Sequence, residues 1–266
     1  MDKTMKDRLS SMEKAVSKRE ASKVYQFPLW AEPQRGLPND FARSALFSAR
    51  KGAGNEFLRD QQIFAQSGIS ITYTGARLTQ DHLDVFEGIM HLARAMPEGS
   101  AVRFTERGLL KLIGRATGGK DHKRLLLTLT DLTATSITIK RGDGRVYWGS
   151  LLPEGAAIPE ENGKYVVILN RQLIKLFERG FTLVEIEQRR ALARSPLAKH
   201  LQCWLSSHEK PYPVTVQYLH DVTDSGTRHL WKFRQSLKAA LDRLVEVGVL
   251  QNWRIDDADK VHLVKA

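Results

Sequence analysis

One glycine-rich segment of this 266-residue chain has the residue types of a phosphate-binding loop, and therefore of nucleotide hydrolysis. It reads Gly114-Arg115-Ala116-Thr117-Gly118-Gly119-Lys120-Asp121. Such a loop ends in a Ser or Thr whose hydroxyl binds magnesium, whereas Asp121 would place a carboxylate beside an anionic nucleotide. Residues 109–113 before it have the pattern of a helix, not of the strand that precedes such a loop. The sequence therefore favours the turn of a helix-turn-helix here, with a nucleotide-hydrolysing enzyme as the weaker alternative.

Other catalytic and metal-binding patterns are missing from the sequence. The eight histidines show no His-x-x-x-His or His-x-His spacing, and none belongs to a local serine or cysteine nucleophile signature. The single cysteine, Cys203, excludes an internal disulfide framework and a multi-cysteine zinc site. We therefore expect no catalytic residue, no metal and no cofactor, and we expect a buried, inert thiol at Cys203.

Cations at the starts of two helices offer a different chemistry, the binding of phosphates and base edges. A basic helix face is usually only solvated. Here the pattern recurs at the same place in both halves of the chain, and Asp242 is the only acid in residues 225–245. We therefore predict DNA-binding residues at the helix starts and on the hairpin that follows each helix. They are Lys120, His122, Lys123, Arg124, Lys140, Arg141 and Arg145 in the first half, and Arg228, His229, Lys232, Arg234, Arg254 and Lys260 in the second.

A winged helix-turn-helix between Tyr212 and Val264 would position the second set of cations. Its apolar residues Leu230, Phe233, Leu237, Leu241 and Leu244 recur at three- and four-residue spacing, which predicts one packed and one positive helix face. A helix in the major groove with a hairpin beside it is a way of holding DNA. The predicted elements are an extended run at 211–216, helices at 217–222 and 228–247, and strands at 249–254 and 260–264.

The same order of elements is predicted earlier in the chain. A half-buried strand at 69–74 and a helix from Thr79 to Met96 come first. The predicted elements that follow are a strand at 102–104, helices at 105–113 and 120–132, and hairpin strands at 136–140 and 145–148. A strand at 165–169 and a short helix at 170–177 would brace the two units, and a leading helix at about 185–207 would open the second unit.

These elements predict an α+β chain with two tandem winged helix-turn-helix domains, at residues 37–180 and 181–266. We expect residues 1–36 to be a flexible basic arm that ends in a linker at 31–38, which is rich in proline and glycine.

Composition bounds the class of partner. The 41 Lys and Arg against 30 Asp and Glu, a formal net charge of +11, suit a polyanion, either nucleic acid or an anionic membrane. No apolar run approaches the ~20 residues that cross a bilayer, and the first residues lack the apolar centre of a signal peptide. We therefore expect a cytoplasmic protein without a membrane partner.

A short peptide in the arm, Gln26-Phe27-Pro28-Leu29-Trp30, has two interpretations. It resembles the peptide by which bacterial proteins bind the replicative sliding clamp, in which case Gln26, Leu29 and Trp30 would fill pockets of the clamp. Its Pro28 and terminal Trp30 depart from the usual form of that peptide. In the other interpretation, Phe27, Leu29 and Trp30 attach the arm to the folded body.

Four segments in order resemble the TrfA-type plasmid replication initiators: residues 37–50, 70–75, 132–135 and 206–213. The resemblance covers the chain from Leu37 to its end. It implies two winged-helix domains that bind directly repeated origin sites, called iterons, and open an adjacent AT-rich region. It also implies recruitment of the host initiator, the replicative helicase and the sliding clamp, with monomers that bind iterons and dimers that restrain copy number.

On this basis we expect a non-enzymatic initiator of plasmid DNA replication whose two basic helices enter successive major grooves, about 34 Å apart. The leading alternative is a winged-helix transcriptional repressor, which binds DNA in the same way but recruits no helicase.

Overall fold

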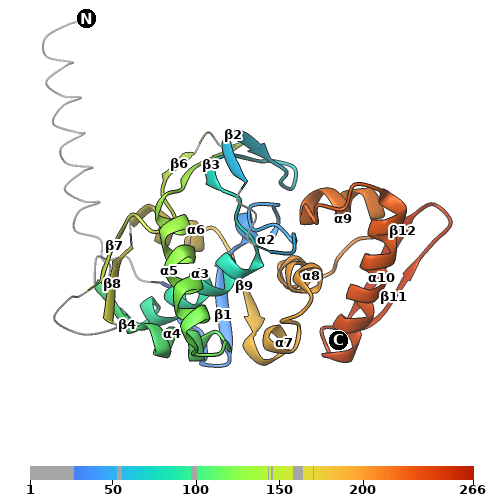
Figure 1. Ribbon diagram of the computed structural model, residues 1–266. Coiled ribbons are helices and arrows are strands. Elements are labelled where there is room, and N and C mark those ends of the chain that lie inside the picture. Colours follow the sequence, from blue (N-terminus) through green and yellow to red (C-terminus); the bar gives the residue numbers. More distant parts are fainter. Residues whose placement is uncertain are drawn as a thin grey trace, which may run out of the picture.

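The computed structural model describes residues 27–52, 56–96, 101–142, 144, 146–157, 164–169 and 171–266. These residues form a mixed α/β structure with two hydrophobic cores (Figure 1). One core draws on residues 27–184 together with Cys203, and the other on residues 192–263 together with Ala49. We call the two parts the first and the second body. Each core includes one residue from the other part of the chain. The two bodies are therefore packed against one another.

The elements of the first body include the predicted ones in the predicted order, with small changes in their bounds, and five more at residues 34–38, 39–42, 57–63, 154–157 and 181–185 that were not predicted. In chain order, the elements are β1 (Gln34–Pro38), α2 (Asn39–Ala42), β2 (Phe57–Ile63), β3 (Ile69–Ala76), α3 (Gln80–Ala93), β4 (Ala101–Thr105), α4 (Glu106–Leu112), α5 (Gly119–Thr133), β5 (Ser136–Arg141), β6 (Val146–Gly149), β7 (Glu154–Ala157), β8 (Lys164–Ile168), α6 (Arg171–Glu178) and β9 (Phe181–Glu185). The predicted alternation in the strand at 69–74 is confirmed, because Ile71 and Tyr73 of β3 are buried.

The sheets of the first body join strands that are far apart in the sequence. One sheet has the order β2-β3-β5-β6, and Ile71 and Tyr73 lie opposite Ile139 and Ile137. A second sheet has the order β4-β8-β7. The hairpin β5–β6 is therefore paired with β3, and β4 is paired with β8 instead of with that hairpin. This pairing sets the first body apart from the second.

Helix α3 lies at the centre of the first body and is buried on almost every side. Thr79 and His82 close its start as a capping box, in which the Thr79 backbone N–H donates to His82 Nδ1 at 3.1 Å. The predicted apolar stripe, which includes Phe86 and Ile89, is confirmed. The opposite side, however, buries three ionisable side chains, Asp84, Glu87 and His91, which the stripe did not reveal.

The predicted linker at 31–38 is wrong, because half of it is a strand. β1 pairs antiparallel with β9, with Leu37 opposite Thr182. The boundary predicted between residues 36 and 37 falls inside this strand. Residues 27–38 therefore belong to the first body, while residues 1–26 of the predicted arm lie outside the described residues.

The single helix predicted at 185–207 is also wrong, because the structure has two helices there. α7 (Ile186–Ala191) ends before a turn, and α8 (Pro196–Ser206) starts afresh. Proline has no N–H to continue a helix but fits the first helical position. The Ser195 hydroxyl caps the new helix by accepting a hydrogen bond from the Ala198 backbone N–H at 3.3 Å.

The second body adds a compact unit to α8. Its elements are β10 (Val214–Thr215), α9 (Val216–Thr223), α10 (Leu230–Glu246), β11 (Leu250–Ile255) and β12 (Lys260–Lys265). The strands have the order β10-β12-β11, with Val214 opposite Val261, so the strand before the two helices closes onto the hairpin that follows them. The predicted helices and hairpin strands of this region are confirmed within two residues, and α10 begins at Leu230 because His229 is extended. The exception is the extended run predicted at 211–216, of which only Val214 and Thr215 form a strand.

The turn between α9 and α10 is attached to the first body. Asp224 has a left-handed backbone, with φ of 39°, and ends α9. Its carboxylate accepts a hydrogen bond from Arg50 Nη2 at 2.9 Å and another from Arg77 Nη1. Next to it, the Ala49 backbone N–H donates to the Thr223 carbonyl at 2.7 Å. These contacts fix one end of α10 relative to the first body.

Candidate nucleic-acid interface

Helix α10 separates a buried apolar face from a polar outer face. Its inward residues, Phe233, Leu237, Ala240, Leu241 and Leu244, are at most 2% exposed, which anchors the helix along its length. Lys232, Arg234 and Lys238 are exposed on its outer surface. Arg228 and His229 are exposed as well and lie just before the first turn. The cations predicted from the sequence are thus brought together at the start of one helix.

Trp231 stands out on this surface, because its indole is 59% exposed between cationic residues. The His229 ring lies nearly parallel to it, with ring centroids 6.4 Å apart, and Lys232 Nζ lies 5.3 Å from the indole centroid. Stacking and cation–π contacts of this kind hold a ring in place without covering its outer side. The first turn of α10 therefore offers an apolar surface as well as positive charge.

The hairpin β11–β12 lies along one flank of α10. Trp253 Nε1 donates to Asp242 Oδ1 at 3.0 Å, and Arg234 Nη2 lies 2.5 Å from Asp259 Oδ1. At the acidic tip, Asp256 makes its contacts within the hairpin. A hydrogen bond from His262 lowers the pKa of Asp256, and its carboxylate also accepts a hydrogen bond from the Lys260 backbone N–H at 2.9 Å. Arg254 and Lys260 remain exposed, as they should if the hairpin meets a polyanion.

A basic groove of about 940 Å³ lies along the other flank of α10, between that helix, the start of α8 and the first body. The described residues that line it include no carboxylate. Lys51 and Arg194 are exposed and make no ion pair among the described residues, whereas Arg50 and Arg243 are paired with Asp224 and Glu246. The lining includes four cations and four hydroxyl groups: Arg50, Lys51, Arg194 and Arg243, and Ser195, Ser225, Thr227 and Ser236. Cations, hydroxyls and a helix start are the groups that bind phosphates.

The cations of α5 are placed differently from those of α10. Lys120 and Lys123 are exposed, but Arg124 pairs with Asp81, and His122 Nδ1 contacts Glu106 Oε2. A hydrogen bond of 2.5 Å from the Tyr165 hydroxyl is the main cause of the lowered pKa of Glu106, and His122 adds to it. The outer face of α5 also carries Leu126 and Leu127, which are 49% and 57% exposed. Two of the four residues predicted on α5, His122 and Arg124, are thus paired with carboxylates of the protein, although Arg124 is itself exposed.

The first hairpin contributes fewer cations than predicted. Lys140 on β5 is exposed, but Arg141 pairs with the buried Asp40. Arg145 lies outside the described residues.

The segment from Gly114 to Asp121 does not have the surroundings of a phosphate-binding loop. It follows helix α4, not a strand, and Lys120 already belongs to the first turn of α5. Gly114 has φ of 72°, and a Cβ there would collide with the Arg190 side chain. Arg115 points back to Asp81 and Asp84. The segment is the turn between two helices, as favoured from the sequence.

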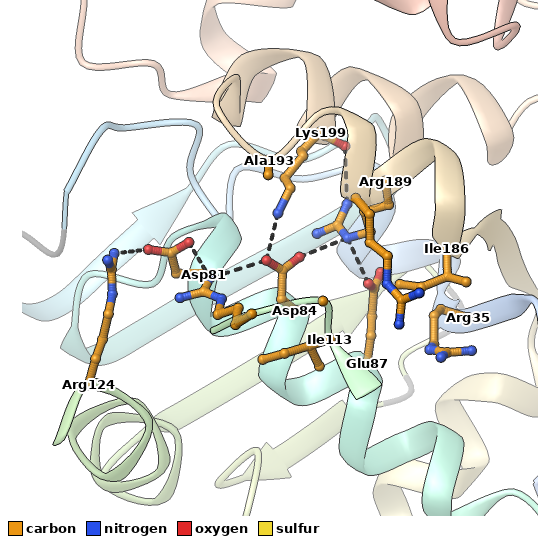
Figure 2. Close-up of a pocket in the computed structure, with 13 residues that line it drawn as sticks. Arg35, Asp81, Asp84, Glu87, Ile113, Arg124, Ile186, Arg189, Ala193 and Lys199 are labelled. Atoms are coloured by element: carbon orange, nitrogen blue, oxygen red, sulfur yellow. Dashed lines mark hydrogen bonds and ion pairs between the residues drawn. The ribbon is translucent and has the colours of Figure 1, made fainter. Parts of the chain in front are cut away.

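A cluster of buried charged side chains lies at the junction of the two bodies, where α3 meets α7 and α8 (Figure 2). Asp84 of α3 meets Lys199 of α8 at 2.6 Å and Arg189 of α7 at 2.9 Å. Burial opposes the charged form of Asp84, but Arg189, Lys199 and Arg115 outweigh it and lower the pKa of this carboxyl. Asp84 is therefore ionised and compensated.

Glu87, one turn further along α3, is in a different state. Its Oε2 lies 2.9 Å from Arg189 Nε, but neither of its oxygens accepts a hydrogen bond from the described residues. Burial, reinforced by the neighbouring Asp84, raises the pKa of Glu87 to about 7. The side of Arg189 away from α3 faces Cys203, whose Sγ accepts from Nη1 at 3.3 Å and whose pKa is raised to about 12 by burial. The buried thiol expected at Cys203 is confirmed.

The peptide at 26–30 is split by the structure. Trp30 is buried, stacks on Phe177 with ring centroids 6.0 Å apart, and donates from Nε1 to His91 Nδ1 at 3.1 Å. Phe27 packs edge-on against the same Phe177. Leu29 is 71% exposed, and Gln26 lies outside the described residues. Phe27 and Trp30 therefore attach this segment to the first body, and in this arrangement the Trp30 ring is not free to enter another protein.

Among the residues that the structure describes, His, Cys, Asp and Glu side chains form no group of three or more that could hold a metal ion. The helices of the same part of the chain include none that is long and apolar enough to cross a membrane.

Comparison with known proteins places the chain in a family. The model of the TrfA protein family matches residues 7–265. The chain belongs to the TrfA family. The resemblance seen in four segments of the sequence is confirmed. The plasmid replication initiator protein TrfA of Escherichia coli is 28% identical over 246 residues, which cover 90% of this chain and 64% of that protein. This chain thus spans less than two-thirds of the length of that protein.

Two solved structures of the protein RctB share the fold of this TrfA-family chain. A selenomethionine derivative of RctB domains 2 and 3 has a TM-score of 0.60 and 12% sequence identity, and the match covers 85% of this chain and 96% of that one. A second structure of RctB domains 2–3 has a TM-score of 0.56 and 12% identity, with 84% and 95% covered. At this identity the likeness concerns the fold alone.

Several residues of the candidate interface were not predicted from the sequence of this TrfA-family chain. Trp231 was overlooked because an aromatic residue in an amphipathic helix is usually part of the core. Lys51 and Arg194 lie in turns, where isolated cations carry no pattern. The break before α8 had a signal, because a serine followed by proline is a helix start. That signal would have placed Arg194 at the mouth of the groove.

Proposed function

We propose that this TrfA-family chain is a plasmid replication initiator that binds double-stranded origin DNA. The observation that carries the proposal is the surface of the second body. The start of α10, the exposed cations of its hairpin and the groove without carboxylates form one positive face. A relative that matches 90% of the chain is named a plasmid replication initiator, which supports a role of this positive face in replication initiation.

We assign a winged helix-turn-helix to each body. In the second body, α8, α9 and α10 with the sheet β10-β12-β11 have the arrangement that places α10 in a major groove. The first body has the same order of elements around α5, with its hairpin extended into a larger sheet. Two such helices on one face of the duplex would read segments about one helical turn apart, so each site would span roughly two turns. Directly repeated sites, or iterons, are the targets we propose.

Binding by many cations makes the affinity depend on salt. Each phosphate that is neutralised contributes about 0.9 to the slope of log affinity against log salt concentration. We expect a slope of several units for a repeat from the plasmid origin, measured by fluorescence anisotropy. A flat salt response would contradict the proposed interface.

Plasmid maintenance separates the initiator from a winged-helix transcriptional repressor. A plasmid that carries only the origin should be maintained when this chain is supplied from a second replicon, and lost when it is not. Footprints on the origin without maintenance would favour the repressor.

Origin opening and host recruitment extend the same proposal. We propose that the bound protein opens an AT-rich region and recruits the host initiator, the replicative helicase and the sliding clamp, with monomers binding iterons and dimers restraining copy number. A clamp contact through Gln26, Leu29 and Trp30 requires Trp30 to leave Phe177. Leu29→Ala tests that contact with Trp30 in place: a clamp pull-down that is unchanged by Leu29→Ala would argue against it.

A further inference from the structure

A connected chain of ion pairs runs through the junction of the two bodies (Figure 2). It begins at Arg124 of α5, which pairs with Asp81 of α3. Arg115 joins Asp81 to Asp84, at 3.2 Å from the latter. Asp84 in turn binds Lys199 of α8 and Arg189 of α7, and Arg189 also lies 2.9 Å from Glu87. Every link joins an acidic side chain to a basic one.

The two ends of this chain lie next to the two helices that the proposed function assigns to DNA. Arg124 is part of α5, and α5 packs on α3. At the other end, Lys199 is part of α8, and α8 packs on α10. The route from one DNA-facing helix to the other therefore passes through α3, α7 and α8 and crosses the boundary between the two bodies at Asp84.

Buried charges restrict how the two bodies can be placed. Asp84, Glu87 and Arg189 are at most 6% exposed. Apolar surfaces tolerate small shifts, but a shift that parted these groups would leave charges unpaired and away from water, which is strongly unfavourable. One relative placement of the two bodies satisfies the chain, and other placements do not.

We propose that Arg189, acting with Asp84 and Glu87, is a positioning residue that fixes the separation and the angular phase of α5 and α10. The chain would thereby set the spacing between the two DNA segments that one molecule reads. The inference rests on the proposed function for its consequence in DNA, but the positioning itself can be measured without DNA.

The variant Arg189→Met/Glu87→Gln removes the buried guanidinium together with the carboxyl group beside it, and leaves Asp84 with Lys199 and Arg115. Glu187→Gln is the matched control, because it breaks the exposed Arg190–Glu187 pair of the same helix α7. Arg189→Lys keeps the positive charge with a single nitrogen, so we expect it to restore part of the effect. It also provides a milder test if the double variant does not fold.

Spin labels at Thr130→Cys of α5 and Lys238→Cys of α10 report the distance between the two helices in the full chain. Both positions are exposed, and the native Cys203 is buried and escapes labelling. Electron–electron resonance should show one narrow distance distribution for the parent protein and for Glu187→Gln. We expect a broadened or second distribution for Arg189→Met/Glu87→Gln. An unchanged narrow distribution in that variant would overturn the inference.

DNA with altered spacing gives the second readout. Inserting two base pairs between the two DNA segments of a repeat rotates one segment relative to the other by about 70° around the axis of the duplex. We expect the parent protein to lose at least about tenfold in affinity, and the double variant less than about threefold. Full discrimination by the double variant would also overturn the inference. If the parent protein binds no origin duplex, the proposed function fails, and the distance measurement still decides whether Arg189 positions the helices.

Discussion

Helices α5 and α10 each follow a shorter helix and precede a hairpin, but their cations have different partners. At α10, Arg228 and Lys232 face solvent and make no ion pair among the described residues. At α5, Arg124 is held by Asp81 and His122 by Glu106. The comparison shows that cations of similar basic patterns can either stay unpaired on the surface or be paired with carboxylates of the protein itself.

The surroundings of the two helices explain the difference. α5 lies against α3, whose carboxylates are needed at the junction with α7 and α8 and take cations from α5 as well. At α10, Arg234 pairs with Asp259 of its own hairpin and Arg243 with Glu246 near the end of the helix. Arg228 and Lys232 at its start make no ion pair among the described residues. We therefore expect most of the DNA-binding free energy to come from the second body.

Removing two cations from each helix tests this expectation most directly. Arg228→Ala/Lys232→Ala should lower the affinity for a cognate repeat by about 100-fold, because a good contact to a base edge contributes about 1–3 kcal/mol. The matched pair Lys120→Ala/Lys123→Ala should cost only about threefold to tenfold, as expected of phosphate contacts. Fluorescence anisotropy on one duplex compares all variants, with circular dichroism as the control for folding. Equal losses from the two pairs would erase the distinction between the bodies.

The junction between the bodies should respond to pH through Glu87. Its pKa of about 7 lies above the ordinary value of 4.5, so the folded state holds a proton that the unfolded state has lost. The stability from this proton is complete below about pH 4.5 and is lost as the pH rises through about 7, a change of at most about 3 kcal/mol. The charged groups that act on Glu87 are Arg189, Asp84, Lys199 and Arg35.

Glu87→Gln should therefore remove the part of the pH dependence of the free energy of unfolding that arises from the proton on Glu87. Denaturant unfolding of both proteins near pH 5 and near pH 8 measures it. Parallel stabilities of the parent and the variant across that range would show that Glu87 is ionised throughout, and that burial does not control it.

Trp231 offers the next test of the outer face of α10. Trp231→Ala should lower the affinity for the cognate repeat by about fivefold to tenfold, because an apolar group in the major groove can contact thymine methyl groups. Trp231→Phe should retain most of the affinity. Trp148→Ala is the control: that indole is 75% exposed on β6 of the first body, and its removal should change affinity less than about twofold. A larger effect at Trp148 would shift the weight of recognition to the first hairpin.

The basic groove should yield the smallest effect, visible mainly in the response to salt. Arg194→Gln should reduce the slope of log affinity against log salt by about 0.9 and leave discrimination between sequences unchanged. Arg103→Gln is a suitable control, since β4 lies on the far side of the molecule from α10 (Figure 1). A variant that lost discrimination but kept its salt slope would make Arg194 a reader of bases.

The second body could be predicted from the sequence because local patterns specify its helices, turn and strands. The apolar spacing of α10, the turn at Asp224 and the paired strands around residues 256–259 all lie within 53 residues between 212 and 264. The first body could be predicted only as an order of elements. The pairing of β4 with β8 joins strands about 60 residues apart, and no local pattern specifies such a partner.

The candidate site shows the same division. The exposed cations of α10 could be found by type and spacing, and their role in DNA binding stays a prediction. The internal pairs of Arg124 and Arg141 could not, because a charged residue on an amphipathic helix or strand gives no sign of its partner. The same holds for Asp84 and Glu87, which a helical pattern assigns to solvent although they lie at the junction.

The ion pairs of Arg50 and Arg77 with Asp224 also restrict how the two bodies can diverge in evolution. A substitution at Asp224 would release a turn of the second body and leave two arginines of the first body without that acceptor. Exchanging one half between relatives would therefore succeed only if Arg50, Arg77 and Asp224 were inherited together. A chimera that lost this trio would lack the contacts that fix one end of α10 relative to the first body.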